Sequence, residues 1–167
     1  MRTLSLNMRQ ALFAQESGEV AIFLLTITHP QLDQPIRLSS DPTQRMGTDP
    51  LYYATVSRAN EYKYVGMEIT LPDEQDQSPP STRMVIGNVD RSIVPLARSV
   101  TSPASVKIEI VLASDPDTVE LSVPALNMVS LDYDVLTLTF DLAMDAFATE
   151  PYPAGNFDPG AFPSLFF

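Results

Sequence analysis

The stretch VKIEIVLASDPDTVELSV, residues 106–123, decides the fold class because apolar and polar side chains alternate along both of its halves. From Val106 to Leu112 every second side chain is apolar, and the alternation resumes from Val119 to Val123, which is typical of half-buried strands. The Asp-Pro-Asp step at residues 115–117 is typical of a turn. We therefore expect two antiparallel strands joined as a hairpin.

The segments after this hairpin extend the pattern. Residues 129–133 and 136–142 again place apolar side chains at every second position. The apolar positions change parity between Tyr133 and Leu136, and a one-residue shift turns every side chain to the other face of a sheet. A turn or bulge is therefore predicted near Asp134, within a meander of antiparallel strands.

The first half of the chain also favours strands. The run EVAIFLLTIT, residues 19–28, is rich in β-branched and aromatic side chains, which predicts a strand buried on both faces. A short strand at residues 35–39 follows across a polar turn, as in a hairpin. Further strands are predicted at residues 62–71 and 83–88, and loops at residues 41–50 and 72–82.

Two segments have helical periodicity. An apolar stripe predicts a helix over residues 4–15 that packs on the sheet, with Thr3 or Ser5 as its N-cap. A second helix is predicted over residues 93–100, with Ser92 as its cap. The whole pattern predicts a mostly β (α+β) fold, an antiparallel β-sandwich or barrel with an N-terminal and a mid-chain helix. The first stripe consists of Leu4, Met8, Ala11 and Leu12.

The composition changes after residue 148, so we divide the chain into a β-rich assembly domain, residues 1–148, and an extended C-terminal arm, residues 149–167. Four prolines keep the arm extended, and four phenylalanines make it strongly apolar. A buried Phe stabilises by roughly 1.5–3 kcal/mol, so the arm should cover an apolar surface, either on its own domain or, as we favour, on a neighbouring subunit. The predicted interface residues are Tyr152, Phe157, Phe162, Phe166 and Phe167.

Charge and composition argue against several classes of function. Ten basic against 21 acidic residues give a net charge of −11, which opposes binding to nucleic acid or to an anionic membrane. No apolar run is long enough to span a bilayer and the first residues lack a secretory signal, so a cytoplasmic product is expected. The chain has no cysteine, which excludes disulfides and thiolate metal sites.

Catalytic chemistry is disfavoured as well. The single histidine, His29, stands at a strand end before a proline, and no nucleophile or orienting partner is marked for it. Glycine-rich phosphate loops and the G-x-S-x-G elbow are absent from the sequence. The acidic steps at residues 115–117 and 132–134 are interpreted as solvated turns, with a cation site or a paired-acid hydrolase as the alternatives. We expect no enzyme activity, cofactor or metal.

A concentration of tyrosines lies near the centre of the chain. Tyrosine rings can stack on sugars or on bases, and the negative charge argues against bases. We favour cross-strand packing or an interface for these rings, with contact to a carbohydrate as the alternative. The four residues are Tyr52, Tyr53, Tyr62 and Tyr64.

Several short segments together resemble a known group of proteins. They are PIRLSS at residues 35–40, EITLP at 68–72, VIGNVDRSIVPLARS at 85–99, KIEIVLASDPDTVE at 107–120 and FPSLF at 162–166. In this order they resemble a small family of siphophage tail proteins and, more distantly, the N-terminal part of lambda-like tail-tip and hub proteins. The most specific positions are Asn88, Asp90 and Arg91, which we interpret as fold-defining. The short polar side chains of Asn88 and Asp90 can satisfy backbone N–H groups between a strand and a helix.

The resemblance implies a virion structural protein of a long-tailed phage, made in the host cytoplasm and built into the tail tip or baseplate. It implies a ring of three or six copies that joins the tail tube to the tip. Distal tail and hub or central-fibre proteins would be its neighbours, without specific nucleic-acid binding and without a membrane. The alternative is a carbohydrate-binding module of a receptor-recognition device. Some lambda-like hub proteins bind an iron–sulfur cluster through cysteines, which this chain lacks.

Overall fold

The computed structural model of the chain describes residues 4–71, 81–87 and 102–144. Several predicted features lie outside these residues. They are the mid-chain helix, most of the 72–82 loop, the domain boundary at residue 148, the C-terminal arm with Tyr152, Phe157, Phe162, Phe166 and Phe167, and the fold-defining residues Asn88, Asp90 and Arg91.

The described part of the chain is mostly β, with strands over 62% of its residues and one helix. All ten strands belong to one sheet, in the order β3-β4-β5-β2-β1-β8-β9-β10-β7-β6. The elements are α1 (Leu6–Phe13), β1 (Ala21–Thr28), β2 (Ile36–Ser39), β3 (Gln44–Thr48), β4 (Leu51–Ser57), β5 (Asn60–Tyr64), β6 (Met67–Ile69), β7 (Ser81–Gly87), β8 (Ser105–Leu112), β9 (Asp115–Tyr133) and β10 (Thr137–Ala143).

The sheet is open and mixed, so the predicted antiparallel sandwich or barrel is not confirmed. Every pair of neighbouring strands is antiparallel except β2 and β5, which run parallel. The parallel pair arises because the chain leaves β2, turns through the β3–β4 hairpin and returns beside β2 as β5. Among the described strands, β3 and β6 are the two edges of the sheet.

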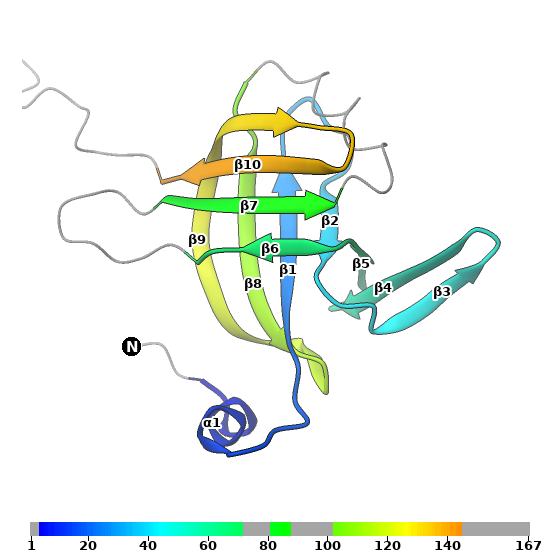
Figure 1. Cartoon of the computed structure of the whole chain (residues 1–167), viewed down its shortest axis with the longest axis vertical. Coiled ribbons are helices and arrows are strands. Elements are labelled where there is room, and N and C mark those ends of the chain that lie inside the picture. Colours follow the sequence, from blue (N-terminus) through cyan, green and yellow to red (C-terminus); the bar gives the residue numbers. More distant parts are fainter. Residues whose placement is uncertain (1–3, 72–80, 88–101, 145–167) are drawn as a thin grey trace, which may run out of the picture.

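The sheet bends along β9, a strand of 19 residues. The first part of β9 pairs with β8, and its last part pairs with β10. Val123 lies opposite Ile108 and Leu126 lies opposite Val106. Two residues of β9, Pro124 and the next one, therefore face one residue of β8, which makes a bulge. A bulge is a favourable place for a proline, which has no N–H for the ladder, and bulges bend strands. As a result β10, β7 and β6 run across β8 and β1 (Figure 1).

A large core fills the space between these crossing parts of the sheet. It joins Leu25 of β1 and Ile108 of β8 to Met84 of β7 and Phe140 of β10, all of them buried. We call this cluster the large core; its buried members are Leu25, Ile27, Leu38, Val65, Met84, Ile86, Ala104, Val106, Ile108, Val123, Leu126, Leu138, Phe140 and Leu142.

The opposite face of β1 packs in a second, small core. Ile22 and Leu24 of β1 join Tyr62 of β5 and Val111 of β8 there, with Val119 at its margin. The prediction that residues 19–28 form a strand buried on both faces is therefore confirmed over the length of β1. The β4–β5 hairpin covers the second face of β1, through Tyr62.

The N-terminal helix is confirmed, with Ser5 as its N-cap. The Ser5 hydroxyl accepts from the Met8 N–H at 3.1 Å. The Ser5 N–H donates to the Glu120 carboxylate at 2.8 Å, and Glu120 is the extra residue of a second bulge in β9. No side chain of α1 is fully buried; of the predicted apolar stripe, Leu4, Met8 and Ala11 are half-buried and Leu12 is exposed, so the stripe is covered only in part. None of the described helices is long and apolar enough to cross a membrane.

Two predictions in the first half were wrong. The loop predicted at residues 41–50 contains β3, which pairs with β4. Its side chains are almost all exposed, so no burial pattern marked it as a strand. The single strand predicted at residues 62–71 is interrupted at Val65 and Gly66, between β5 and β6. The turn predicted near Asp134 is confirmed at residues 134–136.

Candidate functional site

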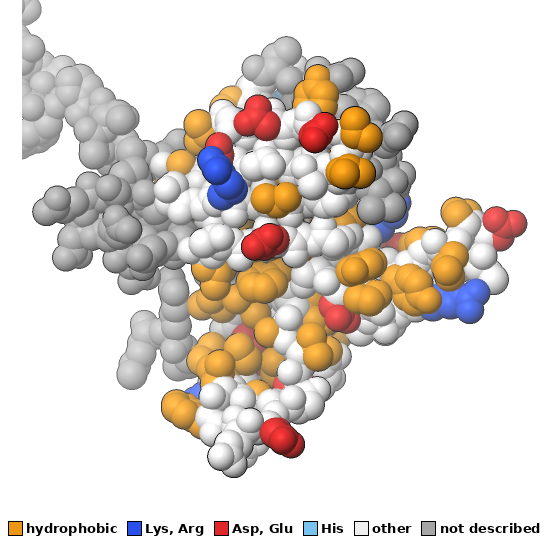
Figure 2. Space-filling view, in the orientation of Figure 1, with side chains coloured by type: hydrophobic (Ala, Val, Ile, Leu, Met, Phe, Trp, Pro, Cys, Tyr) orange, Lys and Arg blue, Asp and Glu red, His pale blue; other side chains and the backbone are white. Residues whose placement is uncertain are grey.

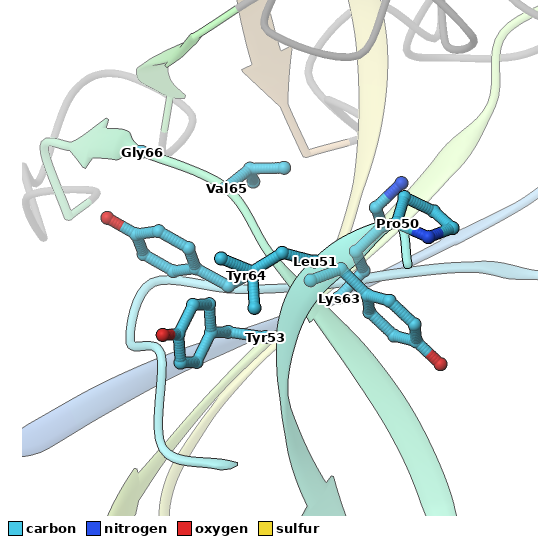
Figure 3. A pocket seen from close by; sticks show the side chains of 8 residues that line it. Pro50, Leu51, Tyr53, Lys63, Tyr64, Val65 and Gly66 are labelled. Atoms are coloured by element: carbon cyan, nitrogen blue, oxygen red, sulfur yellow. The ribbon is translucent and has the colours of Figure 1, made fainter. Parts of the chain in front are cut away.

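An open groove runs beside the β3–β4 hairpin, from the turn at Pro50 and the start of β4 to the end of β5 and the connection to β6. Its volume is about 600 Å³, and its walls are mainly apolar and aromatic. Figure 3 shows the side chains around it. We call it the tyrosine groove; it is lined by Pro50, Leu51, Tyr52, Tyr53, Lys63, Tyr64, Val65 and Gly66.

The ring of Tyr52 is placed by a glycine on the facing strand. Gly47 pairs with Tyr52 across the β3–β4 ladder. A Cβ at Gly47 would lie 2.7 Å from Cε1 of Tyr52 and 2.8 Å from the Pro50 carbonyl oxygen, closer than real atoms approach. Because glycine has no Cβ, the aromatic ring can lie directly over its backbone. Gly47 therefore shapes one wall of the tyrosine groove.

The floor of the groove is fixed to the body of the sheet. The Val65 N–H donates to the Ser39 carbonyl of β2 at 3.0 Å, and the Gly87 N–H of β7 donates to the Gly66 carbonyl at 2.7 Å. The Val65 side chain is a buried member of the large core. At Gly66 a Cβ would meet nothing within 4 Å. The groove is thus open above a backbone that is held from both sides.

Three large side chains remain partly open to solvent at the groove. Leu51 is 57% exposed, Tyr53 is 37% exposed and Tyr64 is 38% exposed. The rings of Tyr53 and Tyr64 lie on the same side of the groove, near Leu51 (Figure 3). Tyrosine offers a large flat apolar surface with a polar tip and little side-chain entropy to lose. Such a surface can bind another apolar, aromatic or ring-shaped group.

Tyr62 has a different role from the other three tyrosines. It is 4% exposed and belongs to the small core. Its hydroxyl lies 3.5 Å from the hydroxyl of Thr26 on β1. The structure therefore brings Tyr52, Tyr53 and Tyr64 together at one site, and it places Tyr62 in cross-strand packing.

A polar clamp holds the β4–β5 turn against β8 and β9. Arg58 and Ala59 occupy the two central positions of this turn with φ of 50° and 60°, as in type I′ hairpin turns. The Arg58 N–H donates to the Asp117 carboxylate. The guanidinium donates to both oxygens of Glu109, at 3.3 and 2.6 Å, and Lys107 Nζ lies 2.7 Å from Glu109 Oε1. We call these contacts the Arg58–Glu109 clamp.

The electrostatics of the clamp follow from its geometry. The hydrogen bond from Arg58 lowers the pKa of Glu109 below its ordinary value of 4.5, although desolvation of this buried carboxylate acts in the opposite direction. The same hydrogen bond raises the pKa of Arg58. The Glu109 side chain is 6% exposed and that of Arg58 is 38% exposed. The clamp is therefore a carboxylate buried under a partly exposed guanidinium, and it serves the fold.

A network of hydroxyl groups braces the chain before β3. The Thr55 hydroxyl lies 2.7 Å from that of Ser39 and 2.8 Å from that of Thr43. The Thr43 hydroxyl also donates to the Asp41 carboxylate at 3.1 Å. These contacts fix the connection from β2 to β3, so the hairpin that carries the groove starts from a defined point.

His29 and Ser102 lie close together, but their polarity does not suit general-base catalysis. The Gln31 N–H donates to His29 Nδ1 at 3.0 Å, so the proton of the neutral ring is on Nε2. Nε2 lies 2.7 Å from the Ser102 hydroxyl oxygen and therefore donates to it. A general base would have to accept the serine proton instead. The pair fixes the end of β1, as expected of a structural histidine.

The acidic steps of the sequence make hydrogen bonds within the fold, and residues 115–117 begin β9, so the turn predicted there lies instead at residues 113–114. Asp117 belongs to the clamp, and Asp134 Oδ1 accepts from the Val135 N–H at 2.7 Å in the β9–β10 turn. Within residues 4–71, 81–87 and 102–144, no three histidine or acidic side chains gather in a way that could hold a metal ion.

Sequence reasoning missed the clamp and found only part of the groove. Glu109 lies on the face of its strand opposite the alternating apolar residues Val106, Ile108 and Ile110, and this pattern alone does not indicate that the carboxylate is buried. The apolar run of β1 was the one available signal, because a strand buried on both faces must have neighbours that are also covered on both faces. In the folded sheet Leu24 of β1 pairs with Glu109 of β8, so the face of β8 that carries Glu109 is covered. The carboxylate then needs a partner, but nothing in the sequence marks Arg58 as that partner.

The chain belongs to a known protein family. The family model of a domain of unknown function, DUF1833, matches residues 7–144. The match begins within α1 and ends one residue after β10. No curated protein matches the chain.

Proposed function

We propose that the chain is a non-enzymatic structural subunit of a long-tailed phage, assembled as a ring of three or six copies in the tail tip. The ring would join the tail tube to the tip, in contact with distal tail and hub or central-fibre proteins. The proposal rests on the resemblance of five sequence segments to siphophage tail proteins and on the surface of the described domain.

The observation that carries the proposal is exposed apolar surface at separate places on the molecule. Large apolar side chains are exposed on α1, at the β9–β10 turn and at the tyrosine groove. Figure 2 shows hydrophobic side chains at several places on the face that it draws. Contiguous exposed apolar surface marks interaction sites in soluble proteins. The exposed residues outside the groove include Leu6, Leu12, Phe13, Val129, Val135 and Leu136.

Separate apolar surfaces suit a subunit with several neighbours better than a single-ligand protein. A copy in a ring contacts the preceding and following copies through different surfaces, and components above and below through others. The net charge of −11 supports the same proposal, because an acidic wall lets DNA pass without binding to it.

The finer architecture is part of the proposal. We propose that the crossing parts of the sheet act as the two layers of a sandwich, with β9 as the strand shared by both. Strands that pass from one layer to the other through bulges form the corners of orthogonal sandwiches. The bulge at Pro124 and the large core between the crossing parts support this description.

Labelling of purified virions tests the function directly. Antibodies against the chain should bind at the tail tip in electron micrographs, and native mass spectrometry should detect multiples of three copies. A protein that is absent from purified virions, or that stays monomeric beside its tail partners, would contradict the proposal.

A second candidate is carbohydrate binding, which is favoured by Tyr52, Tyr53 and Tyr64 around one groove. Aromatic rings can stack on sugar faces, whereas the sugar hydroxyls also need polar partners. Lys63 and the tyrosine hydroxyls are the polar side-chain groups among the lining residues. Glycan-array binding that disappears in Tyr53→Ala would support this candidate, and absence of binding to any glycan would oppose it.

A further inference from the structure

The tyrosine groove has the features of a site for an extended apolar peptide. It is open to solvent, the backbone at Val65 and Gly66 is held by hydrogen bonds to β2 and β7, and tyrosine, leucine and proline side chains line it. Grooves lined by aromatic side chains bind proline-rich segments well, because proline keeps a peptide extended before it binds and little conformational entropy is lost.

The chain itself carries such a peptide. Residues 149–167 contain four prolines and four phenylalanines among 19 residues. These side chains have the chemistry that complements the groove: rings that stack on tyrosine and prolines that pack on flat aromatic faces.

The path of the chain favours a neighbouring copy. β10 ends at Ala143, at the side of the molecule opposite the β3–β4 hairpin in Figure 1. The 24 residues after Ala143 can span about 80 Å when extended, at about 3.3 Å per residue. A segment that starts opposite the groove must pass around its own domain to reach it. It reaches the groove of a copy placed head to tail directly.

We propose that residues 149–167 of one copy dock in the tyrosine groove of the next copy. Such a contact joins two different surfaces, so repeating it generates a closed ring when the rotation between copies closes. The inference rests on the proposed function for its premise that copies assemble, and it names the partner of the groove.

The absence of cysteine makes a direct test possible. Full-length chains with Tyr64→Cys are mixed with full-length chains of a different tag length that carry Phe157→Cys, Phe162→Cys or Phe166→Cys, and the mixture is oxidised. A disulfide-linked heterodimer is expected for at least one pair. The matched control replaces the groove position by Ser17→Cys, an exposed residue that lies outside the groove and outside the apolar surfaces proposed for assembly. Equal crosslinking of the control would overturn the inference.

A chain with both cysteines decides between docking within and between copies. Linked dimers and larger rings are expected from Tyr64→Cys combined with the reactive arm position. A product that is cross-linked within single chains at all protein concentrations would overturn the inference.

A steric variant tests the groove without changing the tyrosines. Gly66→Leu adds a bulky side chain at a position that lines the groove and where a Cβ meets nothing, and Gly18→Leu adds the same side chain at another open position. Self-association measured by sedimentation should weaken at least tenfold in Gly66→Leu and should stay unchanged in Gly18→Leu. Unfolding curves for both variants check that the fold is kept. Unchanged self-association in a folded Gly66→Leu chain would overturn the inference.

Failure here and failure of the proposed function give different results. Crosslinking without labelling of the tail tip would retain the docking and remove the phage assignment. Labelling of the tail tip without crosslinking would retain the phage assignment and overturn the docking. Glycan binding that Gly66→Leu abolishes, together with unchanged self-association, would assign the groove to a sugar instead.

Discussion

The two faces of β1 are covered in different ways. Among the described residues, the large core on one face has 14 buried members, and the small core on the other face has four. The large core lies between two parts of a sheet that share β9. The small core lies under a hairpin that is joined to the body by the parallel β2–β5 pair and by the Arg58–Glu109 clamp. One region depends on apolar burial, and the other depends largely on specific polar contacts.

This difference shows how a scaffold and an interaction site share one strand. Apolar burial is roughly proportional to area and tolerates small changes of shape, whereas a clamp acts only in one geometry. The region with the smaller core is also the region that carries the tyrosine groove. The following changes should separate the two regions, from the largest effect to the smallest.

Phe140→Ala tests the large core. Phe140 is 1% exposed, and its truncation removes a large buried ring and leaves a cavity. We expect the free energy of unfolding to fall by about 3–5 kcal/mol, measured by denaturant titration. A loss below about 1 kcal/mol would mean that the crossing parts of the sheet do not enclose this ring.

Glu109→Gln tests the clamp. The substitution removes the charge that pairs with Arg58 and Lys107 and leaves a side chain of similar size. We expect a loss of about 1–2 kcal/mol, less than for a fully buried pair because Arg58 is partly exposed. Arg58→Met is the matched variant and should lose a similar amount. An unchanged free energy of unfolding in both variants would show that the clamp does not stabilise the fold.

The clamp also predicts a pH dependence. The pKa of Glu109 is lowered in the folded protein, so its contribution is present above the ordinary value of 4.5 and is lost as the pH falls through the lowered pKa. The stability difference between the natural chain and Glu109→Gln should therefore be constant near neutral pH and shrink in acid below about pH 4.5. A difference that stays constant down to pH 2 would contradict this assignment.

Gly47→Ala tests the wall of the groove. The added methyl group would collide with the Tyr52 ring and with the Pro50 carbonyl, so the ring must move. We expect a loss of about 1 kcal/mol together with a change in tyrosine fluorescence, which is readable because the chain has no tryptophan. Gly18→Ala, where a Cβ meets nothing, is the control and should change neither quantity.

Tyr53→Ala tests the exposed ring. Because Tyr53 is partly exposed and belongs to neither core, we expect a change of unfolding free energy within about 0.5 kcal/mol. Tyr62→Ala, at the buried tyrosine of the same hairpin, should cost about 3 kcal/mol or more. Equal losses in the two variants would contradict the division between the groove and the small core.

Period-2 alternation predicted β8 and β10 because each of these strands has a buried face, and a run of β-branched and aromatic residues predicted β1. It failed for β3, where almost every side chain is exposed and only backbone hydrogen bonds define the strand. It also divided β9 into separate strands, because the bulge at Pro124 shifts the alternation without ending the ladder. The mostly β class followed from the alternation, but the sandwich or barrel is not confirmed, since alternation reports that a face is buried and does not report what covers it.

The sequence predicted an aromatic site but not which of the tyrosines line it. Four tyrosines close together in the sequence suggested an aromatic site, but strand pairing decides which rings meet. Tyr62 pairs with Thr55 in the middle of the β4–β5 ladder and is buried. Tyr64 is the last residue of β5, and its side chain is exposed. Gly47 and Gly66 gave no signal, because their roles depend on strands that meet only in the folded sheet.

The continuity of β9 has a mechanical consequence. A force that pulls β8 along its own axis loads the β8–β9 ladder in shear, so many hydrogen bonds must break together. A force on the tip of the β3–β4 hairpin instead peels an edge strand, one hydrogen bond after another. Resistance to pulling depends on the barrier to unfolding and not on equilibrium stability. Under tension, the β3–β4 hairpin should therefore detach first, while the ladders of β9 keep the rest of the sheet paired.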